Sequence, residues 1–458
     1  MKLRLFLIAC LGACAPTVSA VTPTVTAEAD LPPVGAAGGL VMIADTRPVG
    51  QTTPSQPVPY SSIASPGDDE ARLRAWRAAF IQKAVAAGVS RQTAERELAN
   101  ITVERDAIRL DGSQPEFSTP AGLYIQRDTG EATVQRARAK MRELSWLPEI
   151  EQRYGVPGEI IVGIWRQESD LGGNTGSFDV INTLATLSAL SERATPERTA
   201  TRRAAMEGYL IDALKAIDAR KLTRAELKGS WAGAVGQVQF MPTHILNLAV
   251  DGDRDGKVDV RGSARDAFHS AAALLRRDGW KPGQGWHQEV TLPANFNYDL
   301  VEGPKMTPAE WERLGVRRVD GGRWSSADAE AQAGLILPAG ASGPAYLALP
   351  NHYVIRKYNG SVGSPHYAMT VGIIADRMLG RPGPSRSWPA ENRFSVAEIT
   401  AAQRALTAQG FDTNGADGRI GPDTRAAVKA WQKANGVTPD GYLTSGLIAR
   451  ITGQQRGG

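Results

Sequence analysis

A single glutamate on an apolar helical stretch has the clearest potential for chemistry in this chain. Residues 157–173 read PGEIIVGIWRQESDLGG, and helical spacing places four of them on one face, namely Ile161, Ile164, Trp165 and Glu168. Glu168 is the only acid on that face, so its carboxyl should point toward apolar side chains. Burial disfavours the ionised form, so we expect a raised pKa, as a general acid near neutral pH requires. On its own, a buried glutamate is more often a structural residue paired with an arginine.

The ends of this predicted helix place Glu168 near a terminus. Pro157 suits the first turn, and the pair Gly172-Gly173 can end the helix. A helix end can open onto a cleft, where a substrate could reach the acid.

A second unusual stretch, residues 230–242, reads SWAGAVGQVQFMP. Its small residues allow the backbone to approach a ligand closely, and Gln237 and Gln239 offer amide donors and acceptors. These groups suit a sugar with hydroxyl and acetamido substituents. Tight packing is the commoner reason for such small residues.

An acidic loop follows at residues 251–259, DGDRDGKVD. It matches the first part of an EF-hand loop, in which carboxylates at positions 1, 3, 5 and 9 surround a calcium ion and a glycine at position 6 makes the turn. The carboxylates belong to Asp251, Asp253, Asp255 and Asp259. Without a cation these four acids would repel one another, which disfavours the alternative of a merely solvated loop.

The closing part of this loop departs from the EF-hand pattern. Lys257, at position 7, would contribute its carbonyl oxygen, but position 12 is Gly262 instead of a bidentate glutamate. The nearest later acid is Asp266, so the sequence predicts a variant loop with a longer closing arm. Calcium bound there would be structural.

The composition is that of a soluble globular protein. The chain has 458 residues, 42% of them hydrophobic and 22% charged, with a formal net charge of +4, which allows two or three domains. There is no dense run of Lys and Arg, so nucleic acid is not favoured as a partner. The sequence contains no His-x-x-x-His pair and no phosphate-binding glycine loop, and its five histidines are scattered.

The N-terminus predicts export. Two basic residues precede an apolar run at 5–13, typical of a signal peptide over residues 1–20. The sequence LGAC ending at Cys14 resembles a bacterial lipobox, which would anchor the protein to a membrane by a lipid, and we favour an outer-membrane lipoprotein facing the periplasm. The alternative is cleavage after the small residues at 18–20. Cys10 and Cys14 are the only cysteines, so an exported chain would have no disulfide.

Beyond the leader the sequence divides into four parts. Residues 21–67 are rich in Pro, Thr and Ala and predict a flexible linker, and residues 381–394 predict a second one. Between them, residues 68–380 predict a mainly α domain with a small β element, and residues 395–452 predict a three-helix domain. Helical spacing favours helices over 132–153, 158–170, 204–220, 264–278 and 365–380, and alternation favours strands over 288–301 and 347–357.

In this order the motifs resemble those of the B-type membrane-bound lytic murein transglycosylases. The resemblance covers residues 70–380, with blocks at 163–172, 230–242, 251–266, 356–361 and 368–372, and residues 395–452 resemble a peptidoglycan-binding domain. It implies a lysozyme-like α+β core that cleaves the β-1,4 bond between N-acetylmuramic acid and N-acetylglucosamine. By the same resemblance Glu168 acts first as acid and then as base, giving a 1,6-anhydromuramoyl product. Four residues carry over to the substrate groove: Ser230, Gln239, Tyr358 and Asn359.

Two departures from the family pattern accompany this resemblance. Ala273-Leu274 stands where the family often has Asn-Tyr, and the spacing from Asn359 to Tyr367 is longer than usual. Two alternative functions therefore stay open. One is a hydrolytic muramidase in which Asp170 or Asp179 positions water, and the other is a non-catalytic scaffold that binds peptidoglycan strands.

Overall fold

The structure is a computed structural model that describes residues 66–111, 119–193, 195–360 and 365–453. The predicted leader over 1–20, Cys14 and nearly all of the predicted linker over 21–67 lie outside these residues. Within the described ranges, no helix combines the length and the apolar character needed to cross a bilayer.

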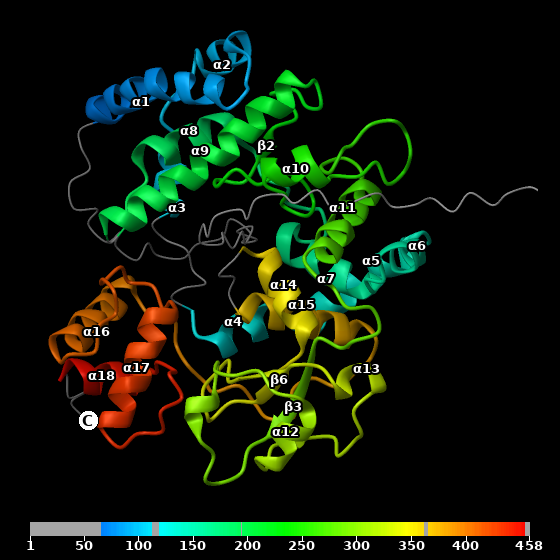
Figure 1. The fold of residues 1–458 in the computed structure, drawn as a ribbon, viewed down its shortest axis with the longest axis vertical. Coiled ribbons are helices and arrows are strands. Elements are labelled where there is room, and N and C mark those ends of the chain that lie inside the picture. Colours follow the sequence, from blue (N-terminus) through cyan, green and yellow to red (C-terminus); the bar gives the residue numbers. More distant parts are fainter. Residues whose placement is uncertain (1–65, 112–118, 194, 361–364, 454–458) are drawn as a thin grey trace, which may run out of the picture. The chain divides into compact units, whose positions relative to one another are not determined.

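Three N-terminal helices pack on a long helical pair. Helices α1 (Pro66–Ala86), α2 (Arg91–Leu98) and α3 (Arg105–Asp111) contact α8 (Val180–Leu190) and α9 (Pro196–Asp218), as Figure 1 shows. A buried ion cluster joins α3 to this pair, because Asp111 accepts hydrogen bonds from Arg193 and Arg202 at 2.7 and 2.8 Å. These two cations keep the pKa of Asp111 well below its usual range despite its burial.

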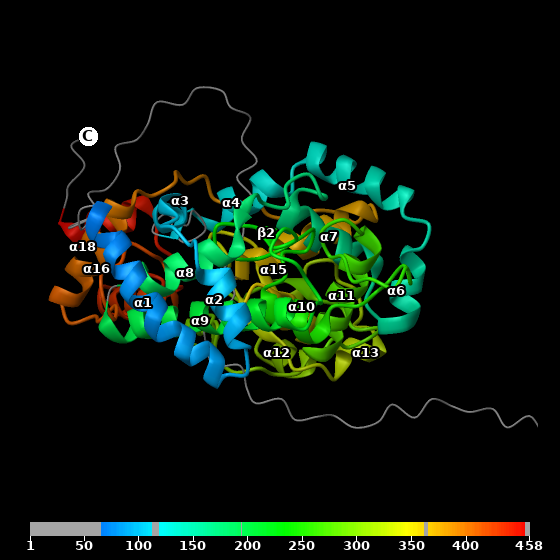
Figure 2. The ribbon, with the colours of Figure 1, turned by 90° about the horizontal axis from the view of Figure 1, so that it is seen from above.

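The centre of the chain is a set of helices around α7 (Gly158–Ser169), the helix that carries Glu168. The neighbours of α7 include α5 (Glu131–Glu143), α6 (Leu147–Tyr154), α11 (Ala264–Arg277) and α15 (Pro365–Met378). Helix α15 also contacts α4 (Ala121–Asp128) and α14 (Pro350–Tyr358), whereas α10 (Pro242–Leu248) packs on α9 and α11. Figures 1 and 2 both show α7 beside α15.

The close crossing of α7 and α15 depends on one glycine. A Cβ atom added to Gly163 would lie 2.7 Å from the carbonyl oxygen of Val371, which is closer than real Cβ contacts. Tyr367 lies one helical turn before Val371, so this approach brings it toward the C-terminal end of α7. The glycine thus sets the spacing between the two helices that form the site.

A small antiparallel sheet forms a second hydrophobic core. Its strands are β3 (His287–Thr291), β4 (Arg317–Arg318), β5 (Gly334–Ile336) and β6 (Ala345–Ala348), in the order β4-β3-β6-β5. In register, Glu289 of β3 faces Tyr346 of β6. The 3-10 turn η2 (Tyr298–Leu300) and helices α12 (Pro308–Arg313) and α13 (Ser326–Ala329) complete this region, and a separate two-stranded ladder pairs β1 (Phe178–Asp179) with β2 (Lys228–Gly229).

The predicted mainly α class is confirmed, but three predicted elements differ. The strand predicted over 288–301 ends at Thr291. Of the strand predicted over 347–357, only residues 347–348 belong to a strand, β6, and the rest is wrong, because helix α14 begins at Pro350. Its buried residues Asn351, Val354 and Ile355 follow helical spacing, and proline favours the first helical turn. The helix predicted over 132–153 is two helices, α5 and α6.

The C-terminal part is the predicted three-helix domain. It consists of α16 (Val396–Ala408), α17 (Pro422–Ala434) and α18 (Ser445–Thr452), which enclose a core that includes Ile399, Val428 and Trp431. Ser395 caps α16 together with Glu398 in a reciprocal capping box.

The segment between the two domains, residues 381–394, has no helix or strand but is held by several contacts. The backbone N–H and the hydroxyl of Ser385 both donate to Glu289 of β3, at 2.9 and 2.6 Å. Trp388 is 9% exposed, and its Cβ lies against Gly122 of α4. Composition predicted a linker here, and the structure shows one that is fixed to the domain it leaves.

Candidate active site

Glu168 lies in the last turn of α7 and is 4% exposed. The apolar face predicted from spacing is buried as well, since Ile161 and Ile164 are fully covered and Trp165 is 5% exposed. Burial raises the pKa of Glu168 to about 8, and a hydrogen bond from Tyr367 acts in the opposite direction. The carboxyl is therefore protonated at neutral pH and can donate its proton.

Tyr367 of α15 provides the direct partner of this acid. Its hydroxyl donates a hydrogen bond to Oε1 of Glu168, and the tyrosine is 1% exposed. Burial, together with the nearby Glu168, raises the pKa of Tyr367 well above its ordinary value, so the hydroxyl stays a donor. Spacing in the sequence did not assign this residue to the groove, yet it makes the shortest contact to the acid.

Tyr358 lies at the end of α14 near the same acid, and Asn359 follows it as the C-cap of that helix. The hydroxyl of Tyr358 donates to the carbonyl oxygen of Val238 at 2.9 Å, and burial, together with the nearby Glu168 carboxyl, raises the pKa of this tyrosine well above its ordinary value. Asn359 is 3% exposed, and its Oδ1 is buried without a hydrogen-bond partner. An unpaired buried amide oxygen is costly and is typical of a site that waits for a ligand donor.

Ser230 and Gln239 belong to the small-residue loop beside α7. Ser230 Oγ accepts a hydrogen bond from the N–H of Ala234 at 3.0 Å, and Gln239 Nε2 donates to the carbonyl oxygens of Gly236 and Thr175 at 2.8 and 3.4 Å. Gln239 adopts a left-handed backbone conformation, with φ at 49°, which is uncommon for a residue with a side chain. These two residues therefore shape the loop and make no direct contact with Glu168.

From the sequence, Gln237 was expected to offer its amide to a sugar, but in the structure its polar atoms bind neighbouring residues. Its Oε1 accepts from the indole N–H of Trp165 at 3.0 Å, and its carbonyl oxygen accepts from the hydroxyl of Ser169 at 2.6 Å. Its Nε2 donates to the carbonyl oxygen of Arg261 at 3.2 Å. Gln237 thus fastens the loop to the residues on both sides of Glu168. Its position within the small-residue stretch 230–242 was the sequence signal that could have pointed to this role.

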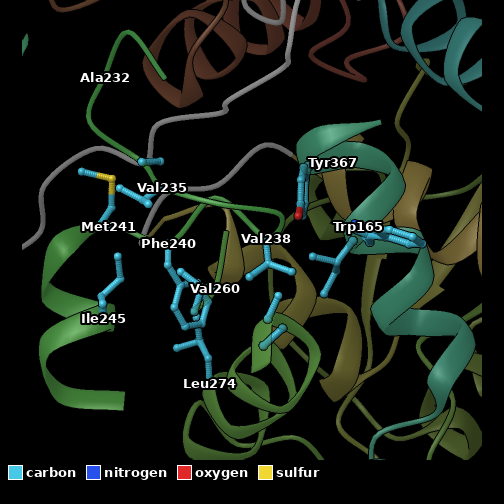
Figure 3. Close-up of a cluster of buried hydrophobic side chains, with 14 of the residues drawn as sticks. Trp165, Ala232, Val235, Val238, Phe240, Met241, Ile245, Val260, Leu274 and Tyr367 are labelled. Atoms are coloured by element: carbon cyan, nitrogen blue, oxygen red, sulfur yellow. The ribbon is translucent and has the colours of Figure 1, made fainter. Parts of the chain in front are cut away.

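The apolar residues of this loop form the packing that holds it. Figure 3 shows Val235, Val238 and Phe240 between Met241 and Ile245 on one side and Trp165 and Tyr367 on the other. Leu274, which stands where the family often has tyrosine, is 1% exposed and belongs to the same cluster. At this position the chain therefore has a core residue in place of a sugar-stacking side chain.

Tyr124 of α4 was also missed by sequence analysis. It is 1% exposed, and its hydroxyl accepts a hydrogen bond from Nε2 of Gln167 at 3.0 Å. It thereby supports the residue directly before Glu168. No local pattern in the sequence pointed to this contact, because the two residues are 43 positions apart.

Neither of the two other carboxylates considered for water positioning is free. Asp170 forms ion pairs with Arg136 and Arg166 at 2.8 and 3.5 Å. Asp179 caps α8 and is bound by Arg224 and Lys228, which lower its pKa against the effect of burial. Both acids are therefore engaged by basic side chains, whereas the hydrogen-bond partner of Glu168 is the neutral hydroxyl of Tyr367.

The acidic loop places three of its predicted ligands together. Carboxylate oxygens of Asp251, Asp253 and Asp255 lie within 4.8 Å of one another, and Oδ1 of Asp251 is buried without a hydrogen-bond partner. The Lys257 amine turns away to Glu226, at 2.6 Å. The three carboxylates and the unpaired oxygen fit a hard cation that binds oxygen ligands.

Asp266, the predicted closing residue, is used differently. Its two oxygens accept hydrogen bonds from the backbone N–H groups of Gly252, Asp253 and Asp259, at 2.8, 3.2 and 2.7 Å. It therefore holds the loop together through the backbone and is not part of the three-carboxylate cluster.

Comparison with known proteins agrees with this geometry. Residues 72–376 match the transglycosylase SLT domain family, and residues 395–451 match a putative peptidoglycan-binding domain. The chain belongs to the transglycosylase SLT domain family. The matched range contains Glu168, Tyr358 and Tyr367 as well as the acidic loop.

Individual relatives are similar over different lengths. Membrane-bound lytic murein transglycosylase B of Escherichia coli K12 is 33% identical over 221 residues, which are 48% of this chain and 56% of that protein. The chain thus spans little more than half of this curated relative. SltB3 from Pseudomonas aeruginosa, solved in complex with NAG-anhNAM-pentapeptide, is 38% identical with a TM-score of 0.73, over 83% of this chain and 99% of that one.

A third relative was solved with a cation. Lytic transglycosylase Slt35 of Escherichia coli, in complex with calcium, is 28% identical with a TM-score of 0.56, over 67% of this chain and 93% of that one. The fold of the present chain is therefore that of the lysozyme-like transglycosylases, with a peptidoglycan-binding domain added at the C-terminal end.

Proposed function

We propose that the protein is a lytic transglycosylase that cleaves the β-1,4 bond between N-acetylmuramic acid and N-acetylglucosamine in peptidoglycan. The observation that carries this proposal is a single buried carboxyl, Glu168, whose pKa is raised to about 8 and whose hydrogen-bond partner is a neutral tyrosine. Family membership and the peptidoglycan-binding domain support the same substrate.

In the proposed reaction Glu168 acts twice. It first donates its proton to the glycosidic oxygen, which leaves as the hydroxyl of the departing sugar. The resulting carboxylate is stabilised by the hydroxyl of Tyr367. It then removes the proton of the muramoyl 6-hydroxyl as that oxygen bonds to the anomeric carbon and closes a 1,6-anhydro ring. The carboxyl ends protonated as it began, and no water is consumed.

The surroundings of Glu168 favour this route over hydrolysis. Glycosidases that use water or a covalent intermediate need a second carboxylate opposite the acid. Asp170 and Asp179, the two candidates from the sequence, are each bound by two basic side chains. A carboxylate held by two basic side chains in this way is poorly placed to activate water.

Mass analysis of the products from purified murein tests the proposal. We expect muropeptides that end in 1,6-anhydromuramic acid, each lighter by one water than its hydrolytic counterpart. Products with a free reducing end and no anhydro form would establish the hydrolytic muramidase instead. Intact murein after prolonged incubation, with wall binding preserved, would establish the non-catalytic scaffold.

The acidic loop leads to a second proposal, that Asp251, Asp253 and Asp255 bind a structural Ca²⁺. The unpaired Oδ1 of Asp251 and the proximity of the three carboxylates support it. A relative of the same fold was solved with calcium. The cation would offset the repulsion among the acids and hold the loop that follows α10; it takes no part in the chemistry.

We further propose that the protein acts in the bacterial envelope, anchored by a lipid on Cys14. The resemblance of LGAC to a lipobox supports the anchor, and a murein substrate requires export. Labelling cells with a radioactive fatty acid tests it: the protein should incorporate label, and the Cys14→Ser variant should not. If neither the wild type nor the variant incorporates label, the alternative of cleavage by ordinary signal peptidase after residues 18–20 would hold instead.

A further inference from the structure

A cavity of about 280 Å³ lies between the three-helix domain and the catalytic domain. One wall is formed by the start of α4, by residues 336–338 after β5 and by His366 of α15, and the other by α17 and residues 440–443. Most of the lining is apolar, including Ile336, Leu337 and Leu443. Its volume is at the lower end of the range for small-ligand pockets, so it fits a short peptide end better than a sugar strand.

Ion pairs around the cavity hold the two walls together. Arg198 of α9 contacts Asp423 at 2.7 Å, and Lys433 of α17 contacts Asp299 at 2.8 Å. The backbone N–H of Ala341 donates to Asp440 at 2.9 Å. Contacts from several elements of both domains therefore enclose the cavity.

Two donors at the cavity have no hydrogen-bond partner. Nε of Arg425 and the hydroxyl of Tyr442 are both buried and unpaired. The remaining contact of the Arg425 guanidinium is a long one, 3.5 Å to Glu302, and the Lys429 amine lies 3.4 Å from the carbonyl oxygen of Val301. Arg425 and Lys429 are half-buried, and the buried, unpaired Nε of Arg425 can still donate to an acceptor, for which an anion is best suited.

The lining also contains two acids, Glu302 and Asp440, which equal Arg425 and Lys429 in number. Asp440 is fully engaged, because its two oxygens accept from Ala341, Gln432 and Tyr442. Burial, together with Arg425 and Arg356, lowers the pKa of His366 to about 3. His366 is thus neutral at physiological pH, and Arg425 and Lys429 are the cations of the lining.

The cavity is adjacent to the catalytic residues. His366 directly precedes Tyr367, whose hydroxyl donates to Glu168. The ring of His366 also lies 6.0 Å from the ring of Tyr124, which supports Gln167. A ligand that contacts His366 in the cavity would therefore lie next to the backbone of Tyr367, whose hydroxyl donates to Glu168.

We propose that this cavity binds a short peptide end, with a small apolar side chain and a free carboxylate, carried by the glycan substrate. The carboxylate would take the donors of Arg425, Lys429 and Tyr442, and the apolar lining would cover a methyl side chain. This rests on the proposed function, since peptidoglycan carries stem peptides that end in D-alanine. The three-helix domain is then part of a composite site that selects strands by their peptides.

Binding to the full chain tests the proposal. In the Glu168→Gln variant, which keeps the cavity, N-acetyl-D-alanyl-D-alanine should bind in a calorimetric titration, and its C-terminal amide should bind at least tenfold more weakly. Arg425→Gln should weaken binding of the acid about tenfold or more, Arg425→Lys should weaken it less, and Tyr442→Phe should weaken it by a few fold. Arg404→Gln is the matched control, because this exposed arginine of α16 belongs neither to the cavity lining nor to the ion pairs that hold its walls together.

Three results would overturn the proposal: no binding of the dipeptide, equal binding of its amide, or equal binding to the Arg425→Gln variant. A kinetic arm separates this proposal from the function of the enzyme. Arg425→Gln should lower kcat/KM more on murein that bears peptides than on glycan stripped of them by an amidase. An equal loss on both would assign Arg425 to domain docking alone. Dipeptide binding without any glycan cleavage by the wild type would refute the proposed function and leave the cavity intact.

Discussion

Two regions of this molecule use carboxylates in opposite ways. At the end of α7 one carboxyl, that of Glu168, is buried alone, and its pKa is raised to about 8. In the acidic loop three carboxylates gather at the surface, with Asp253 and Asp255 exposed. Isolation in an apolar setting makes a proton donor, whereas crowding in water makes a cation site. The same functional group thus gains its role from burial and from its neighbours.

The largest effect should come from removing the isolated carboxyl. Glu168→Gln keeps the shape of the side chain but cannot exchange a proton, so turnover of purified murein should fall about 10³-fold or more. Glu159→Gln, the same change in the first turn of α7, is the control and should retain activity within a few fold. Release of soluble muropeptides measures both. Comparable activity in the two variants would remove Glu168 from the reaction.

The next largest effect concerns the hydroxyl beside that carboxyl. The bond from Tyr367 lowers the pKa of Glu168, so Tyr367→Phe should raise it further. Because the first step needs the protonated acid, kcat/KM of the wild type should fall as pH rises through about 8, and in the variant this fall should move to higher pH. We expect kcat to drop about tenfold to 100-fold, since the carboxylate formed in the reaction loses its donor. A pH profile with an unshifted alkaline limb would contradict the role of Tyr367.

For the crowded carboxylates the expected effect is on stability. If Ca²⁺ occupies the loop, a chelator should lower the melting temperature by about 5 °C, because a ligand at 100 times its Kd stabilises by about 2.7 kcal/mol. The double variant Asp253→Asn, Asp255→Asn should melt at the same temperature with or without chelator. A wild-type protein indifferent to chelator and to added Ca²⁺ would argue against the site.

The smallest effect should come from a third kind of carboxylate, one held by basic side chains. Asp170→Asn removes the partner of Arg136 and Arg166 two residues after Glu168. We expect a loss of activity below tenfold and an unchanged anhydro product, because this acid supports the end of α7 and does not activate water. A loss above 100-fold, with any remaining product hydrolytic, would restore the muramidase alternative.

The sequence was sufficient where a pattern is local. Period alone predicted the buried face of α7, and Asp-Gly turns with apolar spacing predicted the three C-terminal helices. It failed where two local patterns compete, as in the strand predicted over 347–357, where alternation suggested a strand but Pro350 and buried Asn351 fit a helix. The closest partner of the acid could not be found locally, because Tyr367 lies 199 positions from Glu168 and is brought there by packing.

The glycine at the crossing of α7 and α15 has a consequence for how variants of this protein should be read. A single methyl group at Gly163 would press on the backbone of Val371 and push the two helices apart. The acid and its tyrosine would both still be present, and the family block 163–172 would differ only at its first residue. A natural relative with alanine at this position would therefore look active by its motifs while its acid and tyrosine stood too far apart to work together.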